Sequence, residues 1–295
     1  NIKDLTKFIQ YINKKKIKII TKGSAQSYND QIFVKDGIVL DFKNLNKILY
    51  TNYKKKEICV QGGCKIGNII KKLNQKNYTL GAIPGSEHVT IGGAIINNVH
   101  GKDSKSFGTF YNNIIELVVM MTDGKKVSIK KKEIPKILNF GLFYIILEAK
   151  LKIIKTQSQF ICTKKIYFQN LNEMKKLFLS QNYQFIYGWL DFYSYNNSGY
   201  LEVGNYYKGK MYPKKNVLKE ILLFSFNHTT FFSKYFLNRW IVSIVNKIII
   251  YTAKKSRSNI ISLYNYYYPL KNINLNKIFK EGVMELQILI EDNII

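Results

Sequence analysis

The stretch PGSEHVTIGGAIINNVHGK, residues 84–102, decides how this sequence is interpreted. Its glycines are Gly85, Gly92, Gly93 and Gly101. A chain with so few bulky side chains lets the backbone approach a ligand closely and turns N–H groups toward an anion. From Thr90 onward the pattern predicts a turn into a short helix, whose N-terminus would attract a pyrophosphate. Taken alone, the stretch is equally compatible with a plain glycine-rich turn between strands.

A second loop of small residues, TKGSAQSYND at 21–30, follows directly after a predicted strand at 16–21. Two such loops, each after a strand, can clamp a long dinucleotide from two sides. The spacing differs from a Rossmann G-x-G-x-x-G, which lies within one βαβ unit, and the G-K-[ST] of a P-loop does not occur. The two loops together therefore favour a dinucleotide site of another type.

Both loops resemble the FAD-binding domain of the vanillyl-alcohol-oxidase-type (PCMH-type) flavoproteins, and most closely the decaprenylphosphoryl-β-D-ribose oxidases. That family reads roughly G-x-G-R-S-Y-G-D in the first loop, where this chain has GSAQSYND at 23–30. Its second loop reads P-G-x-x-x-V-T-[VI]-G-G-A-I-x-x-[DN]-[IV]-H-G-K, which this chain matches from Pro84 to Lys102. Looser likenesses follow at GWLD (188–191), LNRW (237–240) and YYPL (267–270).

The resemblance implies an α+β fold with a two-subdomain FAD-binding domain at 1–155 and a cap, or substrate, domain at 156–295 that is incomplete at its C-terminus. The residue pattern predicts helices at 4–12, near Leu45, and at 66–73, 171–179 and 231–252. It predicts strands at 16–21, 37–42, 57–61, 114–122, 126–129, 144–154, 161–168 and 185–193.

The resemblance also implies a set of site residues. His100 is expected nearest both flavin and substrate, with Tyr28 beside it as a second catalytic candidate. The substrate side is expected to include Lys102, Trp189, Tyr267 and Gln287. The residues expected to contact FAD are Thr21, Lys22, Gly23, Ser24, Ala25, Gln26, Ser27, Tyr28, Pro84, Gly85, Ser86, Thr90, Ile91, Gly92, Gly93, Asn97, Asn98, Val99, His100, Gly101 and Ile146.

Departures from the family pattern refine this expectation. Many relatives attach FAD covalently through a histidine in the first loop, where this chain has Gln26. An amide cannot form that bond, so we expect non-covalent FAD. Tyr111 and Tyr144 stand where relatives have glycine, close to the expected flavin site. No metal site is expected.

The formal net charge of +27 would suit a nucleic-acid partner, but Arg239 and Arg257 are the only arginines, and arginine is preferred for contacts to bases. The abundance of Lys, Ile, Asn and Tyr indicates an AT-rich genome instead, so we expect no nucleic acid. Three cysteines without a C-x-x-C pair fit a reducing compartment, and we expect a cytoplasmic protein. No apolar run is long enough to predict a spanning helix.

The resemblance implies oxidation of a secondary alcohol on a sugar, with a polyprenylphosphoryl-ribose as substrate, in cell-envelope polysaccharide synthesis. It also implies a reductase partner that completes an epimerisation. The alternatives are an aldonolactone or alditol oxidase acting on a soluble sugar, and an FAD-binding remnant without activity. Residues 221–255 are apolar and basic; they predict either a helix on the inner face of the cytoplasmic membrane or a core helix of the cap.

Overall fold

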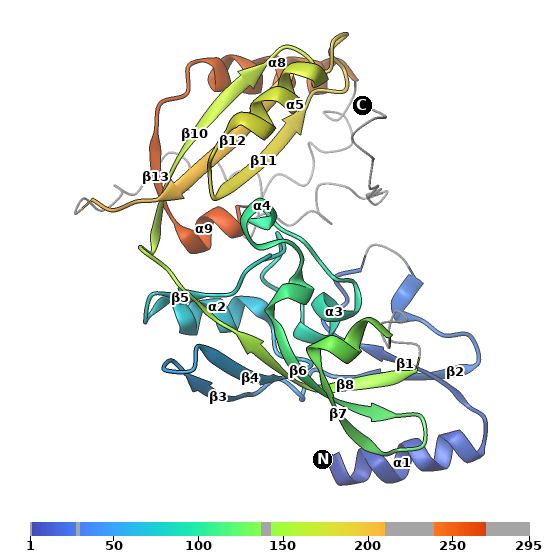
Figure 1. Cartoon of the computed structure of the whole chain (residues 1–295). Helices are drawn as coiled ribbons and strands as arrows, with labels where there is room; N and C mark the ends of the chain where they lie inside the picture. Colours follow the sequence, from blue (N-terminus) through green and yellow to red (C-terminus); the bar gives the residue numbers. More distant parts are fainter. Residues whose placement is uncertain (1, 28–29, 137–142, 210–238, 270–295) are drawn as a thin grey trace. The chain divides into compact units, whose positions relative to one another are not determined.

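The computed structural model describes residues 2–27, 30–136, 143–209 and 239–269 (Figure 1). The chain divides into two compact units, residues 1–156 and 157–295. Each unit is α+β and has a sheet and a hydrophobic core of its own. Within the described ranges, none of the helices combines the length and hydrophobicity that crossing a bilayer requires.

The first unit contains a five-stranded antiparallel sheet in the order β3-β4-β8-β6-β7. Its strands are β3 (Ile48–Asn52), β4 (Glu57–Gln61), β6 (Ile114–Met121), β7 (Lys126–Lys130) and β8 (Tyr144–Lys152). Ile58 pairs with Leu151 and Val60 with Ala149, and all four side chains are buried. The helices α2 (Ile66–Asn74) and α3 (Ile91–Ile96) lie on one side of this sheet (Figure 1).

A smaller layer joins the N-terminal helix α1 (Ile2–Lys14) to the parallel strands β1 (Lys18–Lys22) and β2 (Gly37–Asp41). Ile9 and Ile12 of α1 share a core with Phe42, Met120 and Leu147. That core fixes the ends of β1 and β2 against the larger sheet. The short elements are η1 (Asp30–Ile32), β5 (Tyr78–Thr79) paired with β9 (Ile154–Lys155), α4 (Ser104–Phe107), η2 (Phe110–Asn113) and η3 (Lys131–Lys136).

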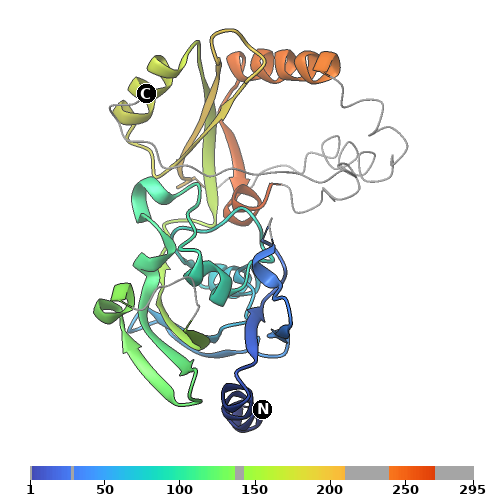
Figure 2. The same ribbon diagram turned by 90° about the vertical axis from the view of Figure 1, so that its right-hand side faces the viewer.

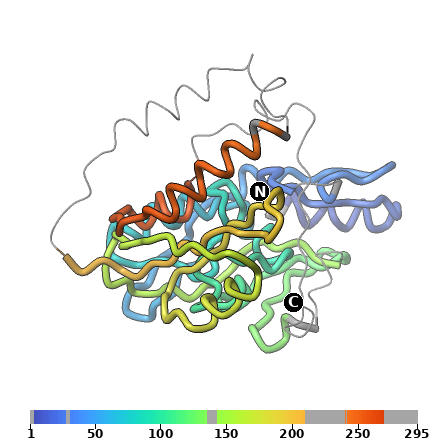
Figure 3. The backbone as a smooth tube through the Cα atoms, turned by 90° about the horizontal axis from the view of Figure 1, so that it is seen from above, coloured from blue at the N-terminus to red at the C-terminus, as the bar shows by residue number. Residues whose placement is uncertain are grey.

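The second unit contains a four-stranded antiparallel sheet in the order β11-β12-β10-β13. Its elements are β10 (Phe160–Phe168), α5 (Leu171–Ser180), β11 (Phe185–Leu190), β12 (Gly199–Tyr206), α8 (Arg239–Lys254), β13 (Asn259–Ser262) and α9 (Leu263–Tyr267). Met174 and Leu177 of α5 pack against Phe168 and its neighbours on one face. Lys254 of α8 lies over the ring of Tyr167, which points to the other face because side chains alternate along a strand. The two helices therefore lie on opposite sides of the sheet (Figures 2 and 3).

Most predicted elements exist, but the short helix at Leu45 is wrong. The Leu45 N–H donates to the carbonyl of Phe42 in a turn, while its own carbonyl accepts from the Gly63 N–H, and β3 follows at once. The predicted strand 185–193 ends at Leu190. Strands β3, β12 and β13 and helix α9 were not predicted. Residues 231–238 of the predicted helix 231–252 lie outside the described residues.

Candidate functional site

The two glycine-rich loops meet in the first unit. A Cβ on Gly23 would lie 2.3 Å from the Thr90 hydroxyl, so only glycine allows this approach. The Ser86 hydroxyl donates a 2.7 Å hydrogen bond to Oε1 of Gln26, whose Nε2 donates to the Ser24 carbonyl at 3.3 Å. Segments far apart in the sequence thus form one structural unit, as the pairing of the loops predicted.

A cavity of about 400 Å³ opens beside the first loop, within the range of small-molecule sites, about 300–1,000 Å³. Its lining residues are Lys22, Gly23, Ser24, Ala25, Asp41, Phe42, Lys43, Asn46, Gly63, Lys65, Asn68 and Thr90. Three lysines face one aspartate, and that carboxylate is already paired with Lys22 Nζ at 3.3 Å. The backbone N–H of Lys43, at 2.9 Å, is the main reason the pKa of Asp41 is lowered. The excess of positive charge suits a pyrophosphate.

Several of these lining residues were not predicted, among them Asp41, Asn46 and Asn68. A signal existed for Asp41, since it ends β2, which runs parallel to β1, and ligands bind beyond the carboxyl ends of parallel strands. No signal existed for Asn68, because it comes from α2 through the tertiary fold alone.

The expected anion-attracting N-terminus of α3 is corrected by the structure. The predicted turn into a short helix exists, and Thr90 caps that helix by accepting from the Gly93 N–H at 3.4 Å. However, the Ile91 N–H donates to the Cys64 carbonyl at 2.9 Å and the Gly92 N–H to the Gly62 carbonyl at 2.7 Å. These donors hold α3 in place and are not available to a ligand.

The first loop supplies the donors instead. Among the described residues, nothing accepts a hydrogen bond from the N–H groups of residues 24–27. Ala25 has a φ of 51°, in the left-handed region, which turns the local backbone sharply. Successive N–H groups in such a turn can form an anion-binding concavity, so this loop is the candidate anion site.

Gly101 and Gly85 of the second loop differ in what requires a glycine at each position. A Cβ on Gly101 would lie 1.9 Å from the Ile83 carbonyl oxygen, so the chain itself requires glycine there. A Cβ on Gly85 would meet nothing within 4 Å, and its φ is not in the left-handed region. No described part of the chain therefore explains why residue 85 is a glycine, whereas a bound group lying over this backbone would explain it. The residues present therefore fit a dinucleotide.

His100 lies in a rigid turn but exposes its imidazole. The following N–H, of Gly101, donates to the Ser104 hydroxyl at 2.8 Å, and the fully buried carboxylate of Asp103 accepts from the Ile83 N–H at 3.2 Å. No described residue makes a hydrogen bond with the His100 side chain. The backbone at His100 is thus fixed, and the exposed ring is available to a ligand.

The other residues expected to contact FAD differ in their surroundings. Asn97 caps α3, its side-chain amide donating to the Gly93 carbonyl at 2.9 Å, and Asn98 accepts from the Tyr111 N–H at 3.0 Å. The Val99 carbonyl accepts from Phe110. Pro84, Ile91 and Ile146 are buried, Thr21 and Lys102 are half-buried, and Ser27 is exposed.

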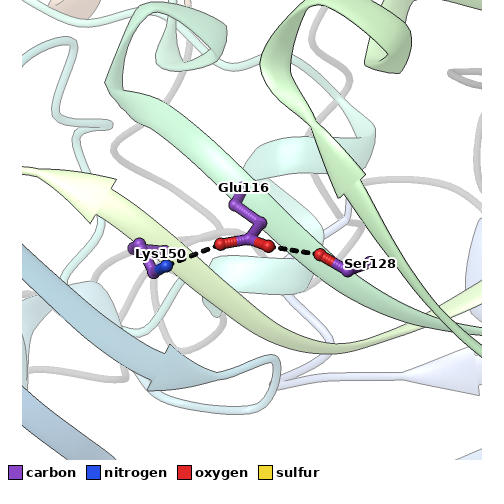
Figure 4. Close-up of polar contacts among 3 residues, drawn as sticks. All are labelled: Glu116, Ser128 and Lys150. Atoms are coloured by element: carbon purple, nitrogen blue, oxygen red, sulfur yellow. Dashed lines mark hydrogen bonds and ion pairs between the residues drawn. The ribbon is translucent and has the colours of Figure 1, made fainter.

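Tyr111 and Tyr144 differ in their surroundings. The Tyr111 hydroxyl donates to the Lys131 carbonyl at 2.8 Å, and its ring lines a separate hollow of about 560 Å³ with Ile115, Glu116 and Lys130–Lys132. Glu116 at this hollow bridges Lys150, at 2.6 Å, and Ser128 (Figure 4). Tyr144 is buried, and its hydroxyl has no hydrogen-bond partner among the described residues. Burial raises the pKa of Tyr144.

The expected substrate residues belong to the second unit, apart from Lys102. Trp189 is half-buried and stacks on Tyr200, with ring centroids 5.6 Å apart. Tyr267 is 1% exposed and packs among Phe185, Tyr266 and Tyr268, so it is a core residue of this unit. Tyr28 and Gln287 lie outside the described residues.

Comparison with known proteins finds similarity that is concentrated in the first unit. A family described as FAD binding domain matches residues 1–130. Decaprenylphosphoryl-beta-D-ribose oxidase of Mycolicibacterium smegmatis is 28% identical over 107 residues, which is 36% of this chain and 23% of that protein. Mitochondrial D-lactate dehydrogenase (cytochrome) of Kluyveromyces lactis is 29% identical over 136 residues, or 45% of this chain and 23% of that protein. The matched part of the chain thus spans about a quarter of these relatives.

A solved structure shares the fold. 6-Hydroxy-D-nicotine oxidase from Arthrobacter nicotinovorans superposes with a TM-score of 0.55 at 17% identity, covering 70% of this chain and 48% of that one. Because 70% of the 295 residues is more than the first unit contains, the likeness in fold includes part of the second unit.

Proposed function

We propose that this chain is an FAD-dependent oxidoreductase of the vanillyl-alcohol-oxidase type that oxidises a secondary alcohol on a sugar, and the match of residues 1–130 to an FAD binding domain supports this. Bound FAD supplies the hydride acceptor. The hydride of the alcohol carbon would pass to FAD, the hydroxyl proton would pass to solvent, and a ketone would remain. The observation that carries the proposal is the hydrogen bond that joins the two loops at Gln26 and Ser86, the second of which also carries the exposed His100.

The chain's own residues have distinct roles in this proposal. The N–H groups of residues 24–27, with Lys22 and Lys65, bind the pyrophosphate. Gly85 leaves room for the cofactor to lie on the backbone. His100 contacts the substrate hydroxyl and orients it. Gln26 holds the loops together without a covalent bond to FAD.

A polyprenylphosphoryl-ribose is the proposed substrate. Support comes from the similarity to the M. smegmatis enzyme and from the match of the H-G-K segment at 100–102. Oxidation to a keto sugar in cell-envelope polysaccharide synthesis would then require a partner reductase to complete an epimerisation.

Flavin reduction tests the proposal directly. The purified chain is loaded with FAD, freed of excess cofactor and mixed without oxygen with a polyprenylphosphoryl-ribose or with a soluble aldonolactone. We expect bleaching of the flavin absorbance with the first, and a slower rate by about 100-fold or more in His100→Ala at unchanged FAD content. Bleaching by the aldonolactone alone would replace the proposed substrate, and a protein that retains no FAD would overturn the proposal.

A further inference from the structure

Helix α8 has one face fixed to its own unit. Asn246 and Ala253 are buried on this face. The Asn246 side-chain amide donates a 2.6 Å hydrogen bond to the buried carboxylate of Asp191, at the end of β11. Lys254 places its ammonium 4.2 Å from the centre of the Tyr167 ring. The helix is therefore held in one rotational setting, and its opposite face is defined.

That opposite face is a stripe of large apolar side chains. Trp240 is 82% exposed, Ile244 56%, Ile248 57% and Tyr251 57%. Their spacing of four, four and three residues keeps them on one side of the helix, opposite Asn246 and Ala253. Single exposed hydrophobic residues are normal, but a continuous stripe of this kind marks an interaction surface.

The charges around the stripe have a single sign. Residues 239–257 contain Arg239, Lys247, Lys254, Lys255 and Arg257 and no aspartate or glutamate. Lys255 lies over the Tyr251 ring, 4.5 Å from its centre, so an ammonium is placed at the stripe itself. A second copy of the helix would oppose like charges, whereas an anionic surface would neutralise them.

We propose that α8 lies flat on an anionic membrane surface, with Trp240, Ile244, Ile248 and Tyr251 in the headgroup region. The helix has the features of an interfacial segment: one apolar face, lysines beside it, and a Trp and a Tyr near its two ends. Each lysine near an anionic leaflet adds electrostatic attraction. This docking is independent of the proposed oxidation.

Vesicle flotation of the full chain tests the docking. We expect co-flotation with vesicles of phosphatidylcholine containing phosphatidylserine, weakened by salt, and little with phosphatidylcholine alone. The double variant Ile244→Ser/Ile248→Ser should lower partitioning about tenfold or more, because two large aliphatic groups leave the interface. The matched control Leu179→Ser removes an aliphatic side chain that is 65% exposed on α5, across the sheet, and should leave partitioning unchanged.

Charge and fluorescence add independent readouts. Lys247→Glu should weaken binding about fivefold or more, while Lys176→Glu on α5 changes the net charge equally and should have a smaller effect. Trp240 emission should shift to shorter wavelength on vesicles, and Trp240→Phe, which retains only Trp189, should not shift.

Three outcomes overturn the proposal. They are no flotation of the wild type, flotation that the double variant retains in full, and wild-type oligomers that dissociate in the double variant without any vesicle binding. The last outcome would assign the stripe to self-association.

Discussion

The Ser86 hydroxyl donates a 2.7 Å hydrogen bond to the Gln26 side chain, across 60 residues of sequence. This bond connects the loop of residues 24–27, whose N–H groups have no acceptor among the described residues, to the loop that carries His100. We expect Gln26→Ala and Ser86→Ala each to weaken FAD binding about fivefold, since a hydrogen bond of this kind contributes about 1 kcal/mol. Titration of the apoprotein with FAD measures the effect.

The double variant makes this test specific. If the two side chains act only through each other, Gln26→Ala/Ser86→Ala should bind FAD no more weakly than either single variant. Additive losses would mean that each side chain contacts the cofactor separately. Denaturation should also release FAD from the wild type, because Gln26 forms no covalent link.

Substitutions at two glycines of the second loop should distinguish an effect on folding from an effect on FAD binding. Gly101→Ala should lower the free energy of unfolding by about 2 kcal/mol or more, because its Cβ would lie 1.9 Å from the Ile83 carbonyl oxygen. Gly85→Ala has open space and should change stability by less than about 0.5 kcal/mol. It should nevertheless weaken FAD binding, since the added methyl group occupies room meant for the cofactor. Normal FAD affinity in Gly85→Ala would remove this residue from the site.

The ion pair of Glu116 and Lys150, 2.6 Å apart on neighbouring strands, predicts a pH dependence (Figure 4). The hydrogen bond from Lys150 lowers the pKa of Glu116. A lowered folded-state pKa stabilises the protein at neutral pH, and the contribution is lost as the pH falls through that value. The free energy of unfolding of the wild type should therefore exceed that of Glu116→Gln by about 0.5–1 kcal/mol at neutral pH. This difference should disappear below a pH of about 4.

The same pair has a second limit at high pH. The hydrogen bond to Glu116 raises the pKa of Lys150. The contribution of Lys150 to the free energy of unfolding is therefore complete below the ordinary lysine pKa and is lost only above it. Urea unfolding at several pH values measures both limits. Glu57→Gln, on the same sheet and without an ion pair in the described structure, serves as the control. A gap that persists in acid would contradict the assignment.

Local patterns predicted much of this molecule. The short apolar run within Glu57–Gln61 and the helical spacing from Ile66 to Leu73 identified β4 and α2, because each pattern is complete within its own segment. The motif at 84–102 likewise located the turn at Thr90 that leads into the short helix α3. What it could not predict is that the Ile91 and Gly92 N–H groups are taken by the carbonyls of Cys64 and Gly62. Those acceptors lie outside the motif, and only the tertiary fold brings them to it.

Thiol reactivity tests the packing that holds α3. Cys64, whose carbonyl accepts from Ile91, is 1% exposed, and burial raises its pKa to about 11. At pH 8 only about one molecule in a thousand would carry the thiolate there, which is the form that reacts.

Burial also raises the pKa of Cys59, whereas Cys162 in the second unit is only half-buried. A disulfide reagent should therefore label one thiol quickly in the native protein and all three in denaturant. Cys162→Ser should abolish the fast phase, and Cys64→Ser should leave it intact. A fast phase that survives in Cys162→Ser would mean that the segment behind the second loop opens readily, and the anchoring of α3 on Gly62 and Cys64 would then be too weak to fix the position of His100.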